Sequence, residues 1–256
     1  MILGWVRAVL LQLAHPLIAA GVADHSTFRG TTEAALTRLH HTVGAMLALT
    51  FGGEQQRQDV LDAIRAIHRR VHGTLPVACG PFPAGTPYSA EDPALLLWVH
   101  ATLIDSILRI YEQLVTPMTG AERDQYCIDS AEVAIALGAR AADVPRRWTQ
   151  LQQYLQATYA SGVITPGGQA RMLAAALLSP VDGLAAAPVS GALTLLAAGL
   201  LPPEVRRAYG FRWSRGRQRS FDGLMVTLRF GRRVTPRAIR WWPEARSGAT
   251  SRHRPQ

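Results

Sequence analysis

The chain has 256 residues and a mass of 27.8 kDa, which suits one large domain or two small ones with a sizeable buried core. Apolar residues make up 48% of it and the mean hydropathy is +0.06, which excludes a disordered chain. Two cysteines are too few for a disulfide framework or a cysteine-based zinc site. They fit a reducing compartment, and we expect a cytoplasmic protein.

The positive charge of the chain is concentrated near its end. All 27 basic residues are arginines, and from residue 204 onward fourteen arginines accompany three carboxylates. That segment therefore carries +11, and residues 1–203 carry about −2. No fingerprint of a nucleic-acid-binding domain accompanies this charge, so we expect no nucleic-acid partner. We interpret residues 216–256 as a basic, arginine-rich extension of a domain formed by residues 1–215, with contact to an anionic membrane as the alternative to a solvated tail.

Apolar residues recur three and four positions apart along most of the chain, and no sustained alternation indicates strands. The sequence therefore predicts an all-α fold, a single-domain bundle of roughly eight to ten helices. In chain order, we expect the longer helices at Leu3–Val22, Thr32–Phe51, Glu54–His72, Pro93–Leu114, Gly120–Leu137, Val144–Ser161 and Gly168–Leu178. Shorter helices are expected near Ala192–Leu200, Glu204–Tyr209 and Phe221–Val234. Residues 73–93 are rich in Gly and Pro and predict a long ordered loop.

Two apolar segments could be mistaken for export or membrane signals. Residues 1–22 carry Arg7 as their one basic residue and are interrupted by His15-Pro16, so we expect a core helix rather than a signal peptide. Residues 183–203 are uncharged and long enough to cross a bilayer. Proline and glycine interrupt them, however, and we expect a buried or interfacial hairpin.

Seven of the eight histidines lie in the first hundred residues, most of them in predicted helices. Histidine is the commonest metal ligand and a proton carrier near neutral pH, and it is seldom fully buried without a partner. The group predicts a buried polar or metal-bearing site, with scattered hydrogen-bonded histidines as the alternative. The seven are His15, His25, His40, His41, His68, His72 and His100.

Arg38, His41 and Thr42 lie on one side of the predicted helix 32–51. An arginine, a histidine and a hydroxyl on a buried stripe require a partner, because burying unpaired polar groups is unfavourable. An anion is one such partner, since arginine binds oxyanions in a bidentate manner. A salt bridge to a neighbouring helix is the alternative.

His68 and His72 are one turn apart in the predicted helix 54–72. The helical zinc motif needs a glutamate between its two histidines and this stretch has arginines, so we discount zinc. A single histidine presented to a haem iron needs no such glutamate. His100, in a very apolar helix, is expected to bond a carbonyl or a carboxylate such as Asp105, and His15 a carbonyl freed by Pro16.

Seven short motifs follow one another along the chain: Arg7 to Pro16 with Gly21 to Ser26, Arg38-x-x-x-Thr42 with Phe51-Gly52, His68-x-x-Val71-x-Gly73, Tyr88 to Pro93, Trp98 to Leu103, Glu122 to Asp124, and Leu200 to Gly210. In this order they resemble a family of all-helical proteins common in actinobacteria, and the resemblance covers roughly residues 4–215. The family includes the latex-clearing rubber oxygenases and the membrane-bound oxygenase of mycophenolic acid biosynthesis.

The resemblance implies an all-α fold that encloses a buried pocket for haem b. It also implies an oxidoreductase that uses O₂ on a hydrophobic small molecule, isoprenoid or lipid-like; the rubber oxygenases cleave an isoprenoid double bond. A non-catalytic haem- or lipid-binding protein is the alternative, and a peripheral membrane protein is a third reading. The oligomeric state is not predicted.

The resemblance also assigns roles to residues. Arg38, His41 and Thr42 match the helix that lies at the haem, with His41 in place of a lysine. By motif the iron ligand is His68, which we expect, and by spacing from Thr42 the alternative is His72. Arg38 would pair a haem propionate, and His41 or Thr42 would bound the distal side.

The remaining histidines are given a secondary role by the resemblance. His15, His25 and His100 would line or support the pocket. The catalytic glutamate of the rubber oxygenases has no counterpart before Arg38, so Asp24 or His25 would have to substitute for it. Rubber itself is therefore not the expected substrate.

Overall fold

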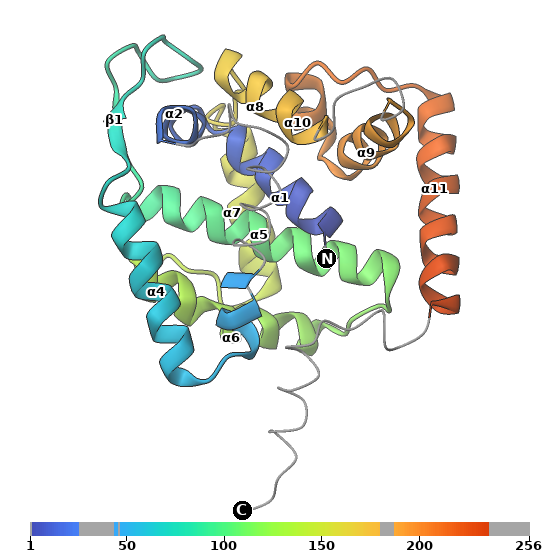
Figure 1. Ribbon diagram of the computed structural model, residues 1–256, viewed down its shortest axis with the longest axis horizontal. Coiled ribbons are helices and arrows are strands. Elements are labelled where there is room, and N and C mark those ends of the chain that lie inside the picture. Colours follow the sequence, from blue (N-terminus) through green and yellow to red (C-terminus); the bar gives the residue numbers. More distant parts are fainter. Residues whose placement is uncertain (1, 26–43, 46, 180–186, 236–256) are drawn as a thin grey trace, which may run out of the picture.

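The computed structural model describes residues 2–25, 44–45, 47–179 and 187–235 (Figure 1). These residues form helices together with one short hairpin, which confirms the predicted all-α fold. Arg38, His41 and Thr42 lie outside the described residues, as do His40 and the end of the chain from residue 236. Both cysteines are free, Cys127 in the core and Cys79 partly covered.

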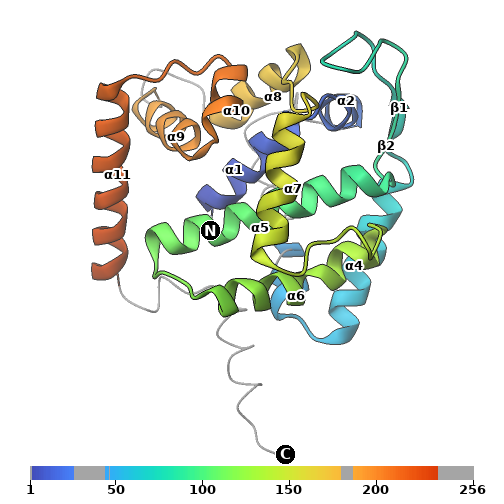
Figure 2. The same ribbon diagram turned by 180° about the vertical axis from the view of Figure 1, so that it is seen from behind.

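The central element is α5 (Pro93–Leu114), which has the bounds that the sequence predicts. Its N-terminus is defined by Asp92, whose carboxylate accepts a 2.8 Å hydrogen bond from the Ala94 amide, and by a proline in the first turn. Helix α1 (Ile2–Leu13) lies along it (Figures 1 and 2). Trp98 of α5 is fully buried and joins the two helices by donating its indole N–H to the Leu11 carbonyl.

The predicted helix Leu3–Val22 is in fact two helices. Helix α1 ends at Leu13 and α2 (Pro16–His25) follows after a bend of 105°. Pro16 explains the break, because it lacks the amide hydrogen that a continuing helix would use. The bend turns α2 away from α5 and brings it against the hairpin and α8.

Helix α4 (Glu54–His68) ends one turn earlier than predicted. The chain then forms a hairpin of β1 (His72–Thr74) and β2 (Pro87–Ser89), in place of the predicted helix end and loop. The strands are antiparallel with His72 opposite Ser89 and Gly73 opposite Tyr88. The packing of Tyr88 requires glycine at position 73, because a Cβ there would lie 2.5 Å from the Tyr88 hydroxyl oxygen.

Helix α6 (Gly120–Leu137) also has its predicted bounds. Thr119 and Glu122 form a reciprocal capping box at its start, and Gly138 ends it in the left-handed conformation. Helix α7 (Trp148–Ala160) follows, four residues later than the predicted start at Val144. Both helices pack against α5.

The last helices are α8 (Gly168–Leu178), α9 (Ala187–Leu200), α10 (Pro203–Ala208) and α11 (Arg215–Val234). Helix α11 stands at the edge of the molecule opposite the hairpin (Figure 1). Its Phe221 and Met225 pack against Ile110 of α5 and the end of α9. Gly199 permits this close approach, because a Cβ there would lie 2.3 Å from the Phe221 ring.

Among the described helices, α5 is long and apolar enough to cross a membrane, and α1 with α2 would pass the same test as a broken span. In α5, 61% of the apolar window is buried inside the protein. It thus has the surroundings of a core helix. The apolar segment 183–203 contains α9, whose C-terminal half, including Leu196 and Leu200, is buried.

Candidate functional site

His68 is the last residue of α4, and its ring is partly buried. Its Nδ1 is sealed from solvent and has no hydrogen-bond partner among the described residues. Burial lowers the pKa of His68 below its usual value, although the nearby Glu91 opposes the shift. The ring is therefore neutral at physiological pH, the form in which imidazole binds a metal.

The face of α4 that carries His68 continues toward the start of the helix. Leu61 is buried and Ile64 half-buried on this face, and Arg57 lies three turns before His68. Arg57 has a weak 3.6 Å ion pair with exposed Glu54, but its Nε is buried and has no hydrogen-bond partner among the described residues. The sequence analysis missed Arg57, which the helical spacing of 57, 61, 64 and 68 could have indicated.

The orphaned atoms on α4 provide a test of whether haem suits this chain. Haem iron takes a neutral imidazole nitrogen, and its propionates take arginine N–H donors. His68 and Arg57 offer one of each, separated by the apolar side chains of Leu61 and Ile64. The donor types therefore fit a haem. The described residues contain no group of three or more His, Cys, Asp or Glu side chains that could hold a bare metal ion.

His72 is not on α4, so the predicted arrangement of His68 and His72 one turn apart is wrong. The helix ends because the Val71 amide bonds back to the His68 carbonyl, and the Val71 carbonyl then accepts from the Ala90 amide of the hairpin. His72 is consequently the first residue of β1, where its side chain is exposed. Its carbonyl meets the ring Nε2 of His25 at 3.0 Å.

His15 occupies the bend between α1 and α2 and is only 6% exposed. Its ring packs against Phe82 at a centroid distance of 5.4 Å, and its buried Nδ1 has no partner in the described structure. The carbonyl bond expected from Pro16 is therefore not made by Nδ1. Burial lowers the pKa of His15 to about 4, with Asp92 opposing the shift.

His100 lies on α5, where burial lowers its pKa to about 4. The described structure shows no hydrogen bond from its ring to Asp105, the partner suggested by the sequence. Instead, Asp105 bonds Arg7, Arg109 and Gln152. His15, His68 and His100 are therefore all neutral near pH 7, and they lie on three different parts of the fold: the α1–α2 bend, the end of α4, and α5.

The end of α2 brings several of the sequence motifs together at the hairpin. The Tyr88 hydroxyl donates a 2.6 Å hydrogen bond to Oδ2 of Asp24. The pKa of Tyr88 is raised above its ordinary range, mainly by burial and further by this hydrogen bond and the charge of Asp24. The exposed His25 ring contacts the edge of Tyr88. Asp24 and His25, the two suggested substitutes for a catalytic glutamate, thus both contact the hairpin.

Arg7 and Asp105 form a buried ion pair that joins α1 to α5 and that the sequence analysis did not predict. Arg7 also donates to Ser106 Oγ at 2.6 Å and to the Leu200 carbonyl at 2.8 Å. Burial alone would raise the pKa of Asp105, but Arg7 and Arg109 hold it below its usual value. The pair therefore links α1, α5 and the end of α9 in the core.

Together these features define an all-α protein with three neutral histidines, two of which, His15 and His68, have a buried Nδ1 without a hydrogen-bond partner among the described residues. The chain belongs to the family described as the catalytic domain of the ER-bound oxygenase mpaB/B′ and rubber oxygenase, whose model matches residues 1–230. It is therefore an oxygenase-type domain. That match confirms the resemblance seen in the motifs.

Relatives are found in mycobacteria. The uncharacterized proteins Rv2237 of Mycobacterium tuberculosis and Mb2261 of Mycobacterium bovis are each 28% identical to the chain over 232 residues. Each alignment covers 89% of this chain and 87% of the relative. No solved structure matches the chain significantly.

Proposed function

We propose that the protein is a haem b-dependent oxygenase that acts with O₂ on a hydrophobic small molecule, isoprenoid or lipid-like. The family is an oxygenase catalytic domain, and the match spans nearly the whole chain. The observation that carries the haem assignment is the neutral His68, with a sealed and unpartnered ring nitrogen at the end of α4.

His68 is the proposed iron ligand, and the structure favours it over His72 for a physical reason. His68 is partly buried on the inner face of α4, whereas the His72 side chain is exposed on a hairpin strand. A haem ligand on that strand would leave much of the porphyrin in water, which is unfavourable for so large an apolar group. Arg57 is a proposed propionate partner on the same helix face.

Arg38, His41 and Thr42 keep the roles that the family motif implies. Arg38 would pair a propionate, and His41 or Thr42 would bound the side of the pocket where O₂ and substrate meet. His15 and His100 would line the pocket or support it as neutral rings, which do not carry charge into an apolar site. Asp24 and His25 would limit the pocket at the hairpin.

When bound, haem would supply the activation of O₂, and the protein would control access and polarity. The apolar side chains of α5 and α4 would exclude water from the proposed pocket, so transfer of an apolar substrate into it would have a favourable free energy. Neutral histidines near them can accept a hydrogen bond at one ring nitrogen and donate one from the other without carrying a charge into the apolar site.

An absorption spectrum of protein produced with haem supply tests the cofactor. A Soret band together with substrate-dependent O₂ uptake would support the oxygenase. A Soret band without uptake on a panel of isoprenoids and fatty acids would favour a haem carrier. A colourless protein with haem supplied would contradict the proposal.

We further propose a cytoplasmic location with peripheral membrane contact through the basic C-terminal residues. Electrostatic attachment of this kind weakens with added salt. Sedimentation with anionic liposomes should therefore fall with salt and on truncation after Gly231. Unchanged sedimentation of the truncated protein would remove the basic tail as the anchor.

A further inference from the structure

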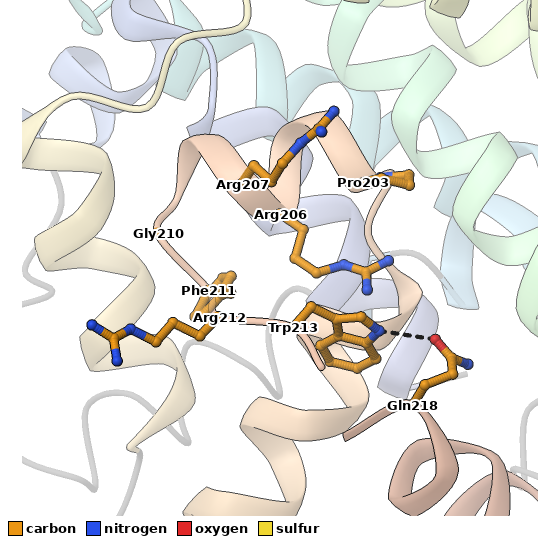
Figure 3. Close-up of a pocket in the computed structure, with 8 residues that line it drawn as sticks. All are labelled: Pro203, Arg206, Arg207, Gly210, Phe211, Arg212, Trp213 and Gln218. Atoms are coloured by element: carbon orange, nitrogen blue, oxygen red, sulfur yellow. Dashed lines mark hydrogen bonds between the residues drawn. The ribbon is translucent and has the colours of Figure 1, made fainter. Parts of the chain in front are cut away.

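A second feature lies far from α4, where α10 meets the start of α11. An open pocket of about 550 Å³ is formed there. Its lining includes the three arginines Arg206, Arg207 and Arg212 and the aromatic rings of Phe211 and Trp213 (Figure 3). None of the residues that line it is acidic.

Arg206 is the buried member of this set, with only 8% of its surface exposed. It donates one hydrogen bond, from Nη2 to the Leu201 carbonyl at 3.2 Å. Its Nε is sealed without a partner, and within the described structure no carboxylate lies within 4 Å of its guanidinium. The charge of Glu204 stabilises the charged form of Arg206, but from beyond 4 Å.

Trp213 holds Arg206 in place. The guanidinium carbon lies 4.1 Å from the centre of the indole ring, a close cation–π contact. Gln218 accepts the indole N–H at 2.9 Å and in turn donates to Asp222, so the ring is fixed from α11. The arginine is therefore presented in one position before any ligand binds.

Arg207 and Arg212 are exposed and extend away from Arg206 on different sides of the pocket (Figure 3). In the described structure neither side chain makes a hydrogen bond or an ion pair. Long arginine side chains at a pocket rim can turn toward a bound anion at small cost. The pocket therefore combines one fixed and two adjustable cations with an apolar floor.

A buried charge is unfavourable unless it is paired, and a cation–π contact with one hydrogen bond compensates it only in part. An oxyanion that reaches the remaining N–H donors of Arg206 would complete the pairing. Phosphate suits three arginines better than carboxylate does, because it carries about −1.5 to −2 charges near pH 7. Phe211 and Trp213 would pack against an apolar group attached to it.

We propose that this pocket binds a phosphate-bearing amphiphile, with the phosphate at Arg206 and the apolar part against the two aromatic rings. The ligand is either a small soluble phosphate ester or the headgroup of a phospholipid, since both present the same chemistry. The proposal does not depend on haem or on turnover, because the pocket lies on α10 and α11 and not on α4.

The test measures binding by titration calorimetry, without any assay of activity. The probes are octyl phosphate below its micelle concentration, inorganic phosphate, octanol and octanoate, and vesicles of phosphatidylcholine with or without phosphatidic acid. The variants are Arg206→Met, the rim double variant Arg207→Gln/Arg212→Gln, and Arg140→Met. Arg140 is an exposed arginine after α6, so its loss removes the same charge at a distant place.

We expect saturable binding of octyl phosphate that exceeds the binding of octanol and octanoate. Arg206→Met should weaken it by about tenfold or more, and the rim double variant by about threefold, because charge-assisted hydrogen bonds are lost. Arg140→Met should bind as the wild type does. If Arg206→Met fails to fold, the rim double variant alone decides the outcome, since its two side chains are exposed and make no hydrogen bond or ion pair in the described structure.

The arms of the experiment also separate the two ligand sources. Octyl phosphate binding in solution indicates a small ester, whereas Arg206-dependent binding confined to phosphatidic acid vesicles indicates a lipid headgroup. Equal loss of binding in Arg140→Met and the pocket variants would overturn the proposal, because it would reflect net charge alone. Absence of wild-type binding both to octyl phosphate and to phosphatidic acid vesicles, or octanoate binding as strong as that of octyl phosphate, would overturn it as well.

Discussion

Arg7 and Asp105 lie 2.7 Å apart in a salt bridge in which at most 2% of either side chain is exposed. Arg7 lies on α1 and Asp105 on α5, and the Asp105 carboxylate also accepts hydrogen bonds from Arg109 and Gln152. Removing one partner leaves the other charge buried and unpaired. We expect Asp105→Asn to lower the free energy of unfolding by about 3–5 kcal/mol, measured by urea denaturation.

The exposed pair Arg146–Glu132 serves as the control, with atoms 3.4 Å apart at the surface. Glu132→Gln should change the free energy of unfolding by less than about 1 kcal/mol. Because the pKa of Asp105 is depressed in the fold, its contribution is complete above the ordinary aspartate pKa and is lost as the pH falls through the folded value. Equal effects of the two variants would contradict this role of the pair.

His68→Ala should abolish or strongly weaken haem binding, because the iron would lose its imidazole ligand. His72→Ala is the matched control, since it removes the same group from the exposed hairpin strand. The measurement is the intensity of the Soret band in protein produced with haem. A normal band in His68→Ala with a lost band in His72→Ala would show that the spacing from Thr42, and not the motif, identifies the ligand.

Arg38→Ala should lower haem occupancy without unfolding the protein. A propionate bonded by an arginine gains charge-assisted hydrogen bonds worth about 1.5–3 kcal/mol, so retention on dilution should fall. Circular dichroism should report unchanged helical content. A much lower melting temperature of the apoprotein, compared with Arg140→Ala, would instead indicate that Arg38 forms a structural salt bridge.

His15 should make the apoprotein less stable in acid. Its pKa is about 4 in the fold against 6.5 for the free group, so the unfolded chain binds the proton first as the pH falls. The free energy of unfolding is therefore undiminished above pH 6.5 and falls as the pH decreases toward 4, by roughly 3 kcal/mol at most. Urea denaturation of wild type and His15→Gln at pH 7 and pH 4.5 measures the difference. The same pH slope in both proteins would exclude His15 as its source.

Truncation after Gly231 should leave the fold and haem binding intact. It removes Arg232, whose guanidinium donates to the Leu114 carbonyl at 2.7 Å and the Val115 carbonyl at 3.2 Å. We expect a loss of about 1–3 kcal/mol of unfolding free energy for these two bonds. Truncation after Ser214 is the contrast, because it removes α11 and uncovers the apolar surface of Ile110, Leu196 and Leu200. That shorter chain should aggregate, and a soluble, folded product would contradict the packing role of α11.

The sequence alone determined the all-α class and the bounds of α5, α6 and α8. Those helices have strong local signals, such as the Asp92-Pro93 start of α5 and the capping box at Thr119. It also identified the family, because short motifs in a constant order do not require contacts to be known, and it proposed His68 as the iron ligand. Local signals were less informative for α4, since its end depends on a hairpin formed with residues further along the chain.

Only the tertiary structure decided which polar groups are paired. Asp105 lies five residues after His100 in sequence, yet it pairs with Arg7, which is 98 positions away. Arg57 and Arg206 became notable only because burial leaves the guanidinium Nε of each without a hydrogen-bond partner among the described residues. Periodicity shows which face of a helix is apolar, but it does not show what that face meets. Burial and pairing depend on contacts between distant segments, and these in turn set the protonation state of each buried histidine.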